Sequence, residues 1–233
     1  MKLLTQRSTS RVALLMVLCA GLSLRVIAQS SSNQFWPEIE GYYSFDPKLR
    51  LGVMASRSTD GASYNSIEVG PTLNFFAKRF VRPVLTTPNE AKNNSLVFGV
   101  GYRYLAGINQ APENRIEIDF TPQVPLPLGL QASDRSRVDV RFIEGAGTSW
   151  RYRNRINLQR TFTIQRFVFS PYGQGEFFYS SSSGSWNKTT YQFGANFPFR
   201  KHFDIELYYE HDNNIGSTPN RVNAFGITTY IYF

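Results

Sequence analysis

Arginine recurs at every second position near residue 150, and this spacing indicates what chemistry the segment could perform. Arg151, Arg153 and Arg155 alternate with Trp150 and Tyr152. Side chains that alternate in this way point to opposite faces of a β-strand. A row of guanidinium groups can pair with carboxylates, bind anions or line an ion pathway. The segment therefore predicts a strand with one strongly cationic face.

Other charged side chains occupy the polar faces of neighbouring segments, and their sign is sorted along the chain. If late segments lie across from middle ones, a transverse field would cross a small pore and orient dipolar or zwitterionic solutes. The alternative is that the charges pair and fill the interior as a buried ion network. The basic set is Arg103, Arg115, Arg137, Arg141, Arg151, Arg153 and Arg155, and the acidic set is Glu176, Asp204, Glu206 and Glu210, with Glu38, Glu40 and Glu68 near the start.

Candidates for catalysis are few, because the chain carries only two histidines, His202 and His211. On one regular strand they would lie about 30 Å apart on opposite faces, so they cannot share a site. His211 and Asp212 resemble the His/acid pair of surface barrel proteases or lipid-modifying enzymes, but adjacent strand residues point in opposite directions. The sequence lacks metalloprotease, phosphate-loop and calcium-loop motifs. We expect no catalytic residue, no metal and no cofactor, and keep a surface barrel enzyme as an alternative.

The elements that must position these side chains are strands, because period-2 alternation runs through most of the chain. Eleven segments show it, each roughly long enough to span an outer membrane. We predict an all-β fold, a transmembrane antiparallel up-and-down β-barrel. With both chain ends in the periplasm the strand number should be even, so we expect about twelve, the extra one in 124–130, with ten as the fallback. The segments are 35–45, 49–56, 67–75, 96–104, 115–120, 137–142, 150–159, 167–179, 191–197, 203–210 and 225–233.

The direction in which the arginines point follows from energetics. An arginine on the lipid face of a barrel costs about 2–4 kcal/mol near the bilayer midplane. Three of them would cost about 6–12 kcal/mol, comparable with the stability of a whole domain. We therefore expect the arginines inside and the aromatic face outside. A soluble β-sandwich is the competing fold, but it would have to expose or pack an unusual number of aromatic residues.

The N-terminus has the features of an export signal, predicted over residues 1–28. Basic residues precede an apolar stretch, 12–24, that is too short for a membrane-spanning helix, and Val26-Ile27-Ala28 offers a cleavage site. A short lead, 29–34, then precedes the barrel, 35–233. The single cysteine, Cys19, would be lost with the signal, which excludes disulfides and thiolate chemistry from the mature chain. The formal charge would fall from +8 to +4 with loss of Lys2, Arg7, Arg11 and Arg25, so it gives little support to a nucleic-acid partner.

The end of the chain is typical of bacterial outer-membrane barrels. Its last nine residues alternate and stop on an aromatic residue, and the apolar face includes Phe225, Ile227, Ile231 and Phe233. We predict this strand as the signal that the barrel-assembly machinery recognises. The expected location is the cell outer membrane, and the expected partners are that machinery, outer-membrane lipid and small polar solutes. Residues 180–186 and 212–220 are predicted as extracellular loops, which leaves an adhesin as a further alternative.

Several short motifs resemble one family, the bacterial outer-membrane barrels grouped as domain of unknown function 2490. The resemblance covers most of the predicted mature chain. It implies a β-barrel and its location, since that family has no established activity to transfer. The motifs are Phe35-Trp36, Glu113-Asn114-Arg115, Trp150 to Arg153, Tyr172 to Phe177, Tyr208-Tyr209-Glu210 and Asn223 to Gly226.

Overall fold

Twelve β-strands account for nearly all of the chain that the computed structural model describes, which is residues 31–60, 63–80, 82–108 and 110–233. The predicted signal peptide, residues 1–28, lies outside these residues. The strands are β1 (Ser31–Asp46), β2 (Leu49–Asp60), β3 (Ser63–Phe76), β4 (Leu96–Gly107), β5 (Gln110–Leu126), β6 (Leu130–Ile143), β7 (Gly147–Arg160), β8 (Phe162–Ile164), β9 (Phe167–Ser180), β10 (Ser185–Arg200), β11 (Phe203–Asn214) and β12 (Arg221–Tyr232). Two short 3-10 helices, η1 (Glu90–Asn93) and η2 (Pro127–Gly129), interrupt them.

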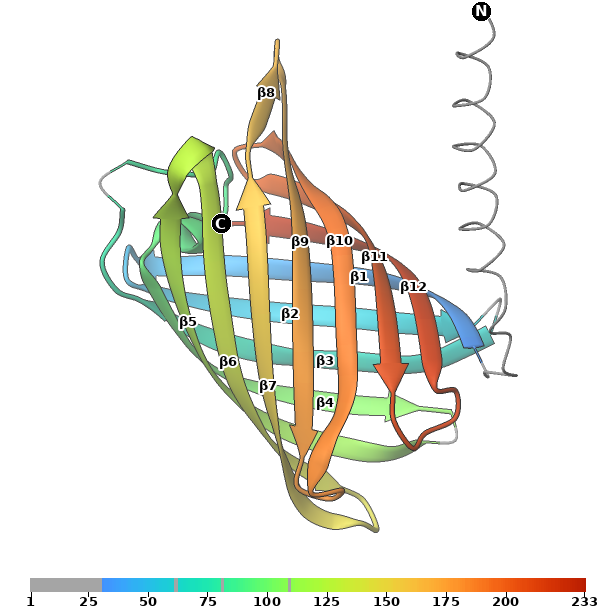
Figure 1. Ribbon diagram of the computed structural model, residues 1–233. Helices are drawn as coiled ribbons and strands as arrows, with labels where there is room; N and C mark the ends of the chain where they lie inside the picture. Colours follow the sequence, from blue (N-terminus) through green and yellow to red (C-terminus); the bar gives the residue numbers. More distant parts are fainter. Residues whose placement is uncertain (1–30, 61–62, 81, 109) are drawn as a thin grey trace, which may run out of the picture. The chain divides into compact units, whose positions relative to one another are not determined.

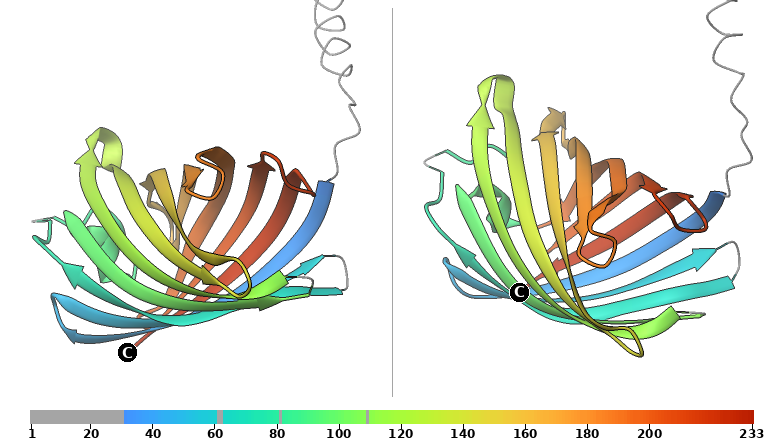
Figure 2. Two further views of the ribbon diagram at one scale, coloured as in Figure 1. Left: turned by 90° about the horizontal axis from the view of Figure 1, so that it is seen from below. Right: turned by 60° about the horizontal axis from the view of Figure 1, so that its bottom comes forward.

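Eleven of the strands form a closed barrel (Figures 1 and 2). Successive strands pair antiparallel from β1 to β7, then through β9 to β12, and β12 returns to β1. The three-residue strand β8 lies outside this ring and pairs only with β9. The all-β barrel and its twelve strands are confirmed. The position of the extra strand is corrected, because residues 124–130 form the end of β5, the turn η2 and the start of β6.

The barrel closes through a parallel pair, which an even-numbered barrel would not need. β1 and β12 run side by side from Ser31 opposite Arg221 to Tyr42 opposite Tyr232. Ser31 and Tyr232 therefore lie at opposite mouths, contrary to the expectation of an even ring with both ends on one side. A parallel pair also satisfies the backbone hydrogen-bonding groups of the first and last strands, so the barrel can close with an odd number of strands. β1 begins at Ser31, four residues before the expected start, because β12 supplies partners for these residues.

The barrel is polar inside and apolar outside. On β6, Val138 is 38% exposed while Asp139 beside it is fully buried, and on β10 Phe193 is 63% exposed while Gln192 is 7%. The same alternation holds on the other long strands, as the period-2 pattern predicts. Burial is thus reversed relative to a water-soluble domain, in which large apolar side chains fill the interior. No helix in the described residues is long and apolar enough to cross a membrane.

The two mouths of the barrel differ in their connections. The C-terminal mouth, where β12 ends, holds the longest connection, residues 77–95 between β3 and β4. Figure 1 shows this segment in teal, with its short helix, near the C-terminus. The turns at the opposite mouth include 181–184 after β9 and 215–220 after β11. The β8–β9 hairpin extends from the C-terminal mouth.

Candidate functional site in the lumen

Glu176 on β9 gathers three arginines from β6 and β7. It is 2% exposed and lies 2.9 Å from Arg135, 2.9 Å from Arg153 and 2.7 Å from Arg155. Arg153 and Arg155 each donate two hydrogen bonds to its carboxylate. The ladder creates this arrangement, because Arg155 stands opposite Glu176 while Arg135 stands opposite Arg155. Facing arginines would repel one another, so a buried acceptor between them is required.

A second set of ion pairs continues across β3 to β7. Glu113 forms ion pairs with Arg115 at 2.8 Å and with Arg141 at 2.7 Å. These two arginines stand opposite each other on β5 and β6. The remaining contacts join residues that stand opposite each other or diagonally on neighbouring strands. They join Arg137 to Glu117 at 2.9 Å and to Asp119 at 3.3 Å, Arg151 to Asp139 at 2.6 Å, and Arg103 to Glu68 at 3.5 Å and Glu117 at 3.7 Å.

All seven arginines of the predicted lumen set thus lie in two neighbouring ion-pair clusters, one with Glu68, Glu113, Glu117 and Asp119 and one with Asp139 and Glu176. We call the two clusters together the arginine wall, formed by inward side chains of β3 to β7 and β9. Glu176 belongs to this wall, although we grouped it with the acidic set by its place in the chain. The predicted lumen set did not include Arg135 or the acids Glu113, Glu117, Asp119 and Asp139. Their signal was present as polar residues alternating with apolar ones, but their pairing depends on the strand register.

The other acidic residues of the predicted set lie on different strands. Glu38 and Glu40 come from β1, and Glu206 and Glu210 come from β11. Among the described residues, no lysine or arginine nitrogen forms an ion pair within 4 Å of any of these four carboxylates. Tyrosine hydroxyls meet two of them, since Tyr42 donates to Glu40 and Tyr230 donates to Glu206. We call this surface the acid–tyrosine wall; it also includes Tyr172 and Tyr208.

Glycines let the tyrosine rings lie against this wall. A Cβ atom at Gly226 would fall 2.0 Å from the Tyr208 ring, and one at Gly194 would fall 2.8 Å from the Tyr172 hydroxyl. A Cβ atom at Gly52 would likewise fall 2.8 Å from the ring of Tyr42. Each tyrosine therefore leans over the next strand at a position where only hydrogen leaves enough room.

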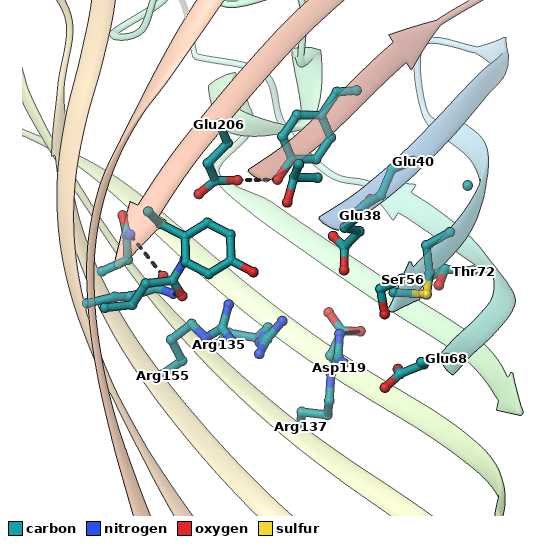
Figure 3. A pocket seen from close by; sticks show the side chains of 18 of the residues that line it. Glu38, Glu40, Ser56, Glu68, Thr72, Asp119, Arg135, Arg137, Arg155 and Glu206 are labelled. Carbon is teal, nitrogen blue, oxygen red and sulfur yellow. Dashed lines mark hydrogen bonds and ion pairs between the residues drawn. The ribbon is translucent and has the colours of Figure 1, made fainter. Parts of the chain in front are cut away.

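A cavity of about 740 Å³ separates the two walls. Figure 3 shows Glu206, Glu38 and Glu40 on one side and Arg135, Arg137 and Arg155 on the other. Its volume falls within the range of small-molecule sites, about 300–1,000 Å³. The cavity also contacts Asn89, Ala91 and Lys92 of the 77–95 connection.

That connection bridges the C-terminal mouth, and we call it the plug. Leu85, Asn89 and Asn93 of the plug are at least nine-tenths buried. Its hydrogen bonds reach five barrel strands and the residue after β7. They join Asn89 to Arg50 at 2.7 Å, Thr87 to Asp204 at 3.1 Å, Lys92 to Asn196 at 3.0 Å, the Ala91 carbonyl to Gln123 at 2.9 Å, the Lys92 carbonyl to Gln131 at 2.5 Å, and the Thr86 amide to Thr161 at 3.1 Å.

Asp204 therefore serves the plug rather than the cavity, although it was predicted as a lumen charge. Its side chain is completely buried, and Oδ1 has no hydrogen-bond partner within the described structure. The contact with Thr87 spans 117 residues of sequence. No local pattern predicts a contact between positions so far apart in the chain.

The histidines lie apart from the cavity and from each other. His202 is in the turn before β11 and contacts the Tyr232 carbonyl, while His211 contacts Asn223. Asp212 points inward and pairs with Lys188 at 2.6 Å. Within the described residues, no group of three histidine, cysteine, aspartate or glutamate side chains is arranged to hold a metal ion.

The predicted assembly signal lies on β12 and the final residue. Phe225 and Phe233 are 54% and 73% exposed on the outer face, and Ile227 and Ile231 are intermediate. The end of the chain is fixed by backbone hydrogen bonds from Tyr232 to His202 and from Phe233 to Tyr42. The apolar face of this strand thus points outward, while recognition by the assembly machinery stays a prediction.

The architecture defines a β-barrel with a charged lumen that is plugged at one mouth. Residues 33–223 match the family described as "Protein of unknown function (DUF2490)", and the chain belongs to this family. The match extends over nine complete barrel strands, β2 to β7 and β9 to β11, most of β1 and the first three residues of β12, together with the plug and the arginine wall. No curated protein matches the chain.

Proposed function

We propose that the protein is an outer-membrane β-barrel that forms a narrow, plugged pore for small polar solutes. Its support is the reversed burial, with a band of exposed Ile, Val, Phe and Trp side chains around a polar cavity. Such a surface suits lipid and a closed ring of strands suits a membrane, because no backbone edge is left unpaired. The protein would act without catalytic residues, metal or cofactor.

The direction of β12 supports an orientation in the membrane. Barrels that end on an aromatic strand leave their C-terminus in the periplasm, so the plug would close the periplasmic mouth. The turns 181–184 and 215–220 would then face the outside. The proposal includes outer-membrane lipid and the barrel-assembly machinery as partners.

The observation that carries the pore is a cavity closed by a segment held through polar contacts. Few large apolar side chains are buried among the plug's described residues, and its best-defined contacts are its hydrogen bonds with Arg50, Asp204, Asn196, Gln123 and Gln131. A typical hydrogen bond contributes only about 0.5–1.5 kcal/mol net. Water and solute groups can replace such contacts, so the plug is suited to rearrange while the barrel stays intact.

Conductance in planar bilayers tests this proposal. The refolded protein should show small or infrequent steps, and a variant with residues 80–93 replaced by a short Gly-Ser linker should show larger, persistent ones. Arg155→Glu in that variant should shift ion preference toward cations, because this side chain lines the cavity and is 25% exposed. A folded barrel in both forms, verified by its gel mobility before and after heating, with no conductance would refute the pore.

A filled structural barrel is the second candidate. The ion network of the arginine wall favours it, because these contacts occupy much of the lumen beside β5 to β9. This candidate predicts no conductance from the linker variant. It also predicts that loss of buried carboxylates destabilises the barrel without changing permeability.

A further inference from the structure

The two walls of the cavity carry opposite charge, and each has groups that could still bind a ligand. Glu38 and Glu206 occupy one row of the sheet, because both stand opposite Thr228 on β12. They lie in a wall of tyrosine rings, and the described chain offers neither of them an ion pair. Carboxylates and aromatic faces together are the groups that bind organic cations.

The chain itself shows that one of these rings accepts a cation. The Arg50 guanidinium lies 3.9 Å from the centre of the Tyr42 ring, whose hydroxyl donates to Glu40. Tyr172, Tyr208 and Tyr230 have no such contact with a cation among the described residues. The cavity therefore has further aromatic and carboxylate surface of the same chemistry.

The opposite side presents guanidinium groups to the cavity. Arg135, Arg137 and Arg155 line it, and their side chains keep 18%, 13% and 25% exposure although each is paired with a carboxylate of the chain. Guanidinium N–H groups form strong, charge-assisted hydrogen bonds with carboxylates. The exposed part of this wall can therefore bind the carboxylate of a ligand.

We propose that the lumen binds a small dipolar solute whose ammonium or guanidinium end meets Glu38, Glu206 and the tyrosine rings, while its carboxylate meets the arginine wall. This names the solute class for the proposed pore and rests on a lumen that solutes can enter. Neither end alone satisfies both walls. A solute with both charges should therefore bind better than a purely cationic or anionic one of similar length.

Calorimetric titration of the refolded, detergent-solubilised protein tests the proposal. The probes are L-arginine, agmatine, which lacks the carboxylate, and succinate, which lacks the cation. L-arginine should bind at least about tenfold more tightly than either, the ratio expected for one charge-assisted contact. Equal affinity for L-arginine and agmatine, or no detectable binding of L-arginine, would overturn the proposal.

Two variants locate the site. Glu206→Gln should weaken L-arginine and agmatine binding about tenfold and leave succinate unaffected. Glu144→Gln is the matched control, since it makes the same change on an exposed turn. A loss of cation binding in Glu144→Gln, or unchanged binding in a folded Glu206→Gln, would contradict the assignment.

The proposed function and this inference can fail separately. Binding without conductance in the linker variant would refute the pore and keep the solute class. Conductance without binding of any probe would keep the pore and refute the solute class.

Discussion

Replacing Glu176 by glutamine should destabilise the barrel more than any other single loss of lumen charge. Its carboxylate is the acceptor for Arg135, Arg153 and Arg155, with ion-pair distances of 2.7–2.9 Å. Removal of one partner from a buried pair costs about 3–5 kcal/mol, because the other charge is left uncompensated. The three arginine side chains retain 14–25% exposure, so water in the cavity relieves part of this penalty. We expect a loss of about 3 kcal/mol in the free energy of unfolding.

The assay is guanidinium-induced unfolding in lipid vesicles, followed by tryptophan fluorescence. Asp119→Asn is the comparison, because among the described residues Asp119 has one ion pair, to Arg137 at 3.3 Å, and should lose about 1 kcal/mol or less. A loss below about 1 kcal/mol in Glu176→Gln, the range of exposed pairs, would show that water screens the network. The energetic case for a buried ion network would then be wrong.

Three further changes test the glycine contacts, the plug and the outer face. Gly226→Ala should lower the unfolding free energy by about 1–3 kcal/mol, because its Cβ would meet the Tyr208 ring at 2.0 Å; unchanged stability would mean that the ring can move away at no cost. Leu85→Ala should destabilise the packing of the plug against the barrel by about 2–5 kcal/mol and raise the frequency of conductance steps. An unchanged frequency would show that the packing of the plug does not control opening. Ile156→Arg, at a site 55% exposed, should cost about 2–4 kcal/mol in bilayers, and an equal cost of the same substitution in detergent and in bilayers would speak against a lipid-facing position.

Much of the barrel could be predicted from the sequence, because strand geometry forces alternate side chains into different environments. The eleven segments chosen by their alternation correspond to the eleven strands of the ring. The inward direction of Arg151, Arg153 and Arg155 also follows from a local argument, since the cost of lipid exposure needs no knowledge of neighbours. Strand ends were less predictable, as in β7, which runs from Gly147 to Arg160.

The pairing of charges could not be predicted, because it depends on how strands are aligned. Glu113 joins Arg115 and Arg141 only because the register of β5 and β6 brings the two arginines opposite each other. The plug was equally hidden, since its polar residues find partners on strands up to 117 positions away. The parity rule was misleading for a related reason. It assumes antiparallel closure, whereas β1 and β12 run in the same direction.

An odd ring closed by a parallel seam also restricts how such a protein can change in size. Insertion or duplication of a hairpin adds two strands at a time, so the count stays odd and the seam persists. A shift to an even ring needs the gain or loss of a single strand, which would move one chain end to the other mouth of the barrel. Descendants of this cylinder should therefore vary in circumference by pairs of strands while the β1–β12 seam is inherited.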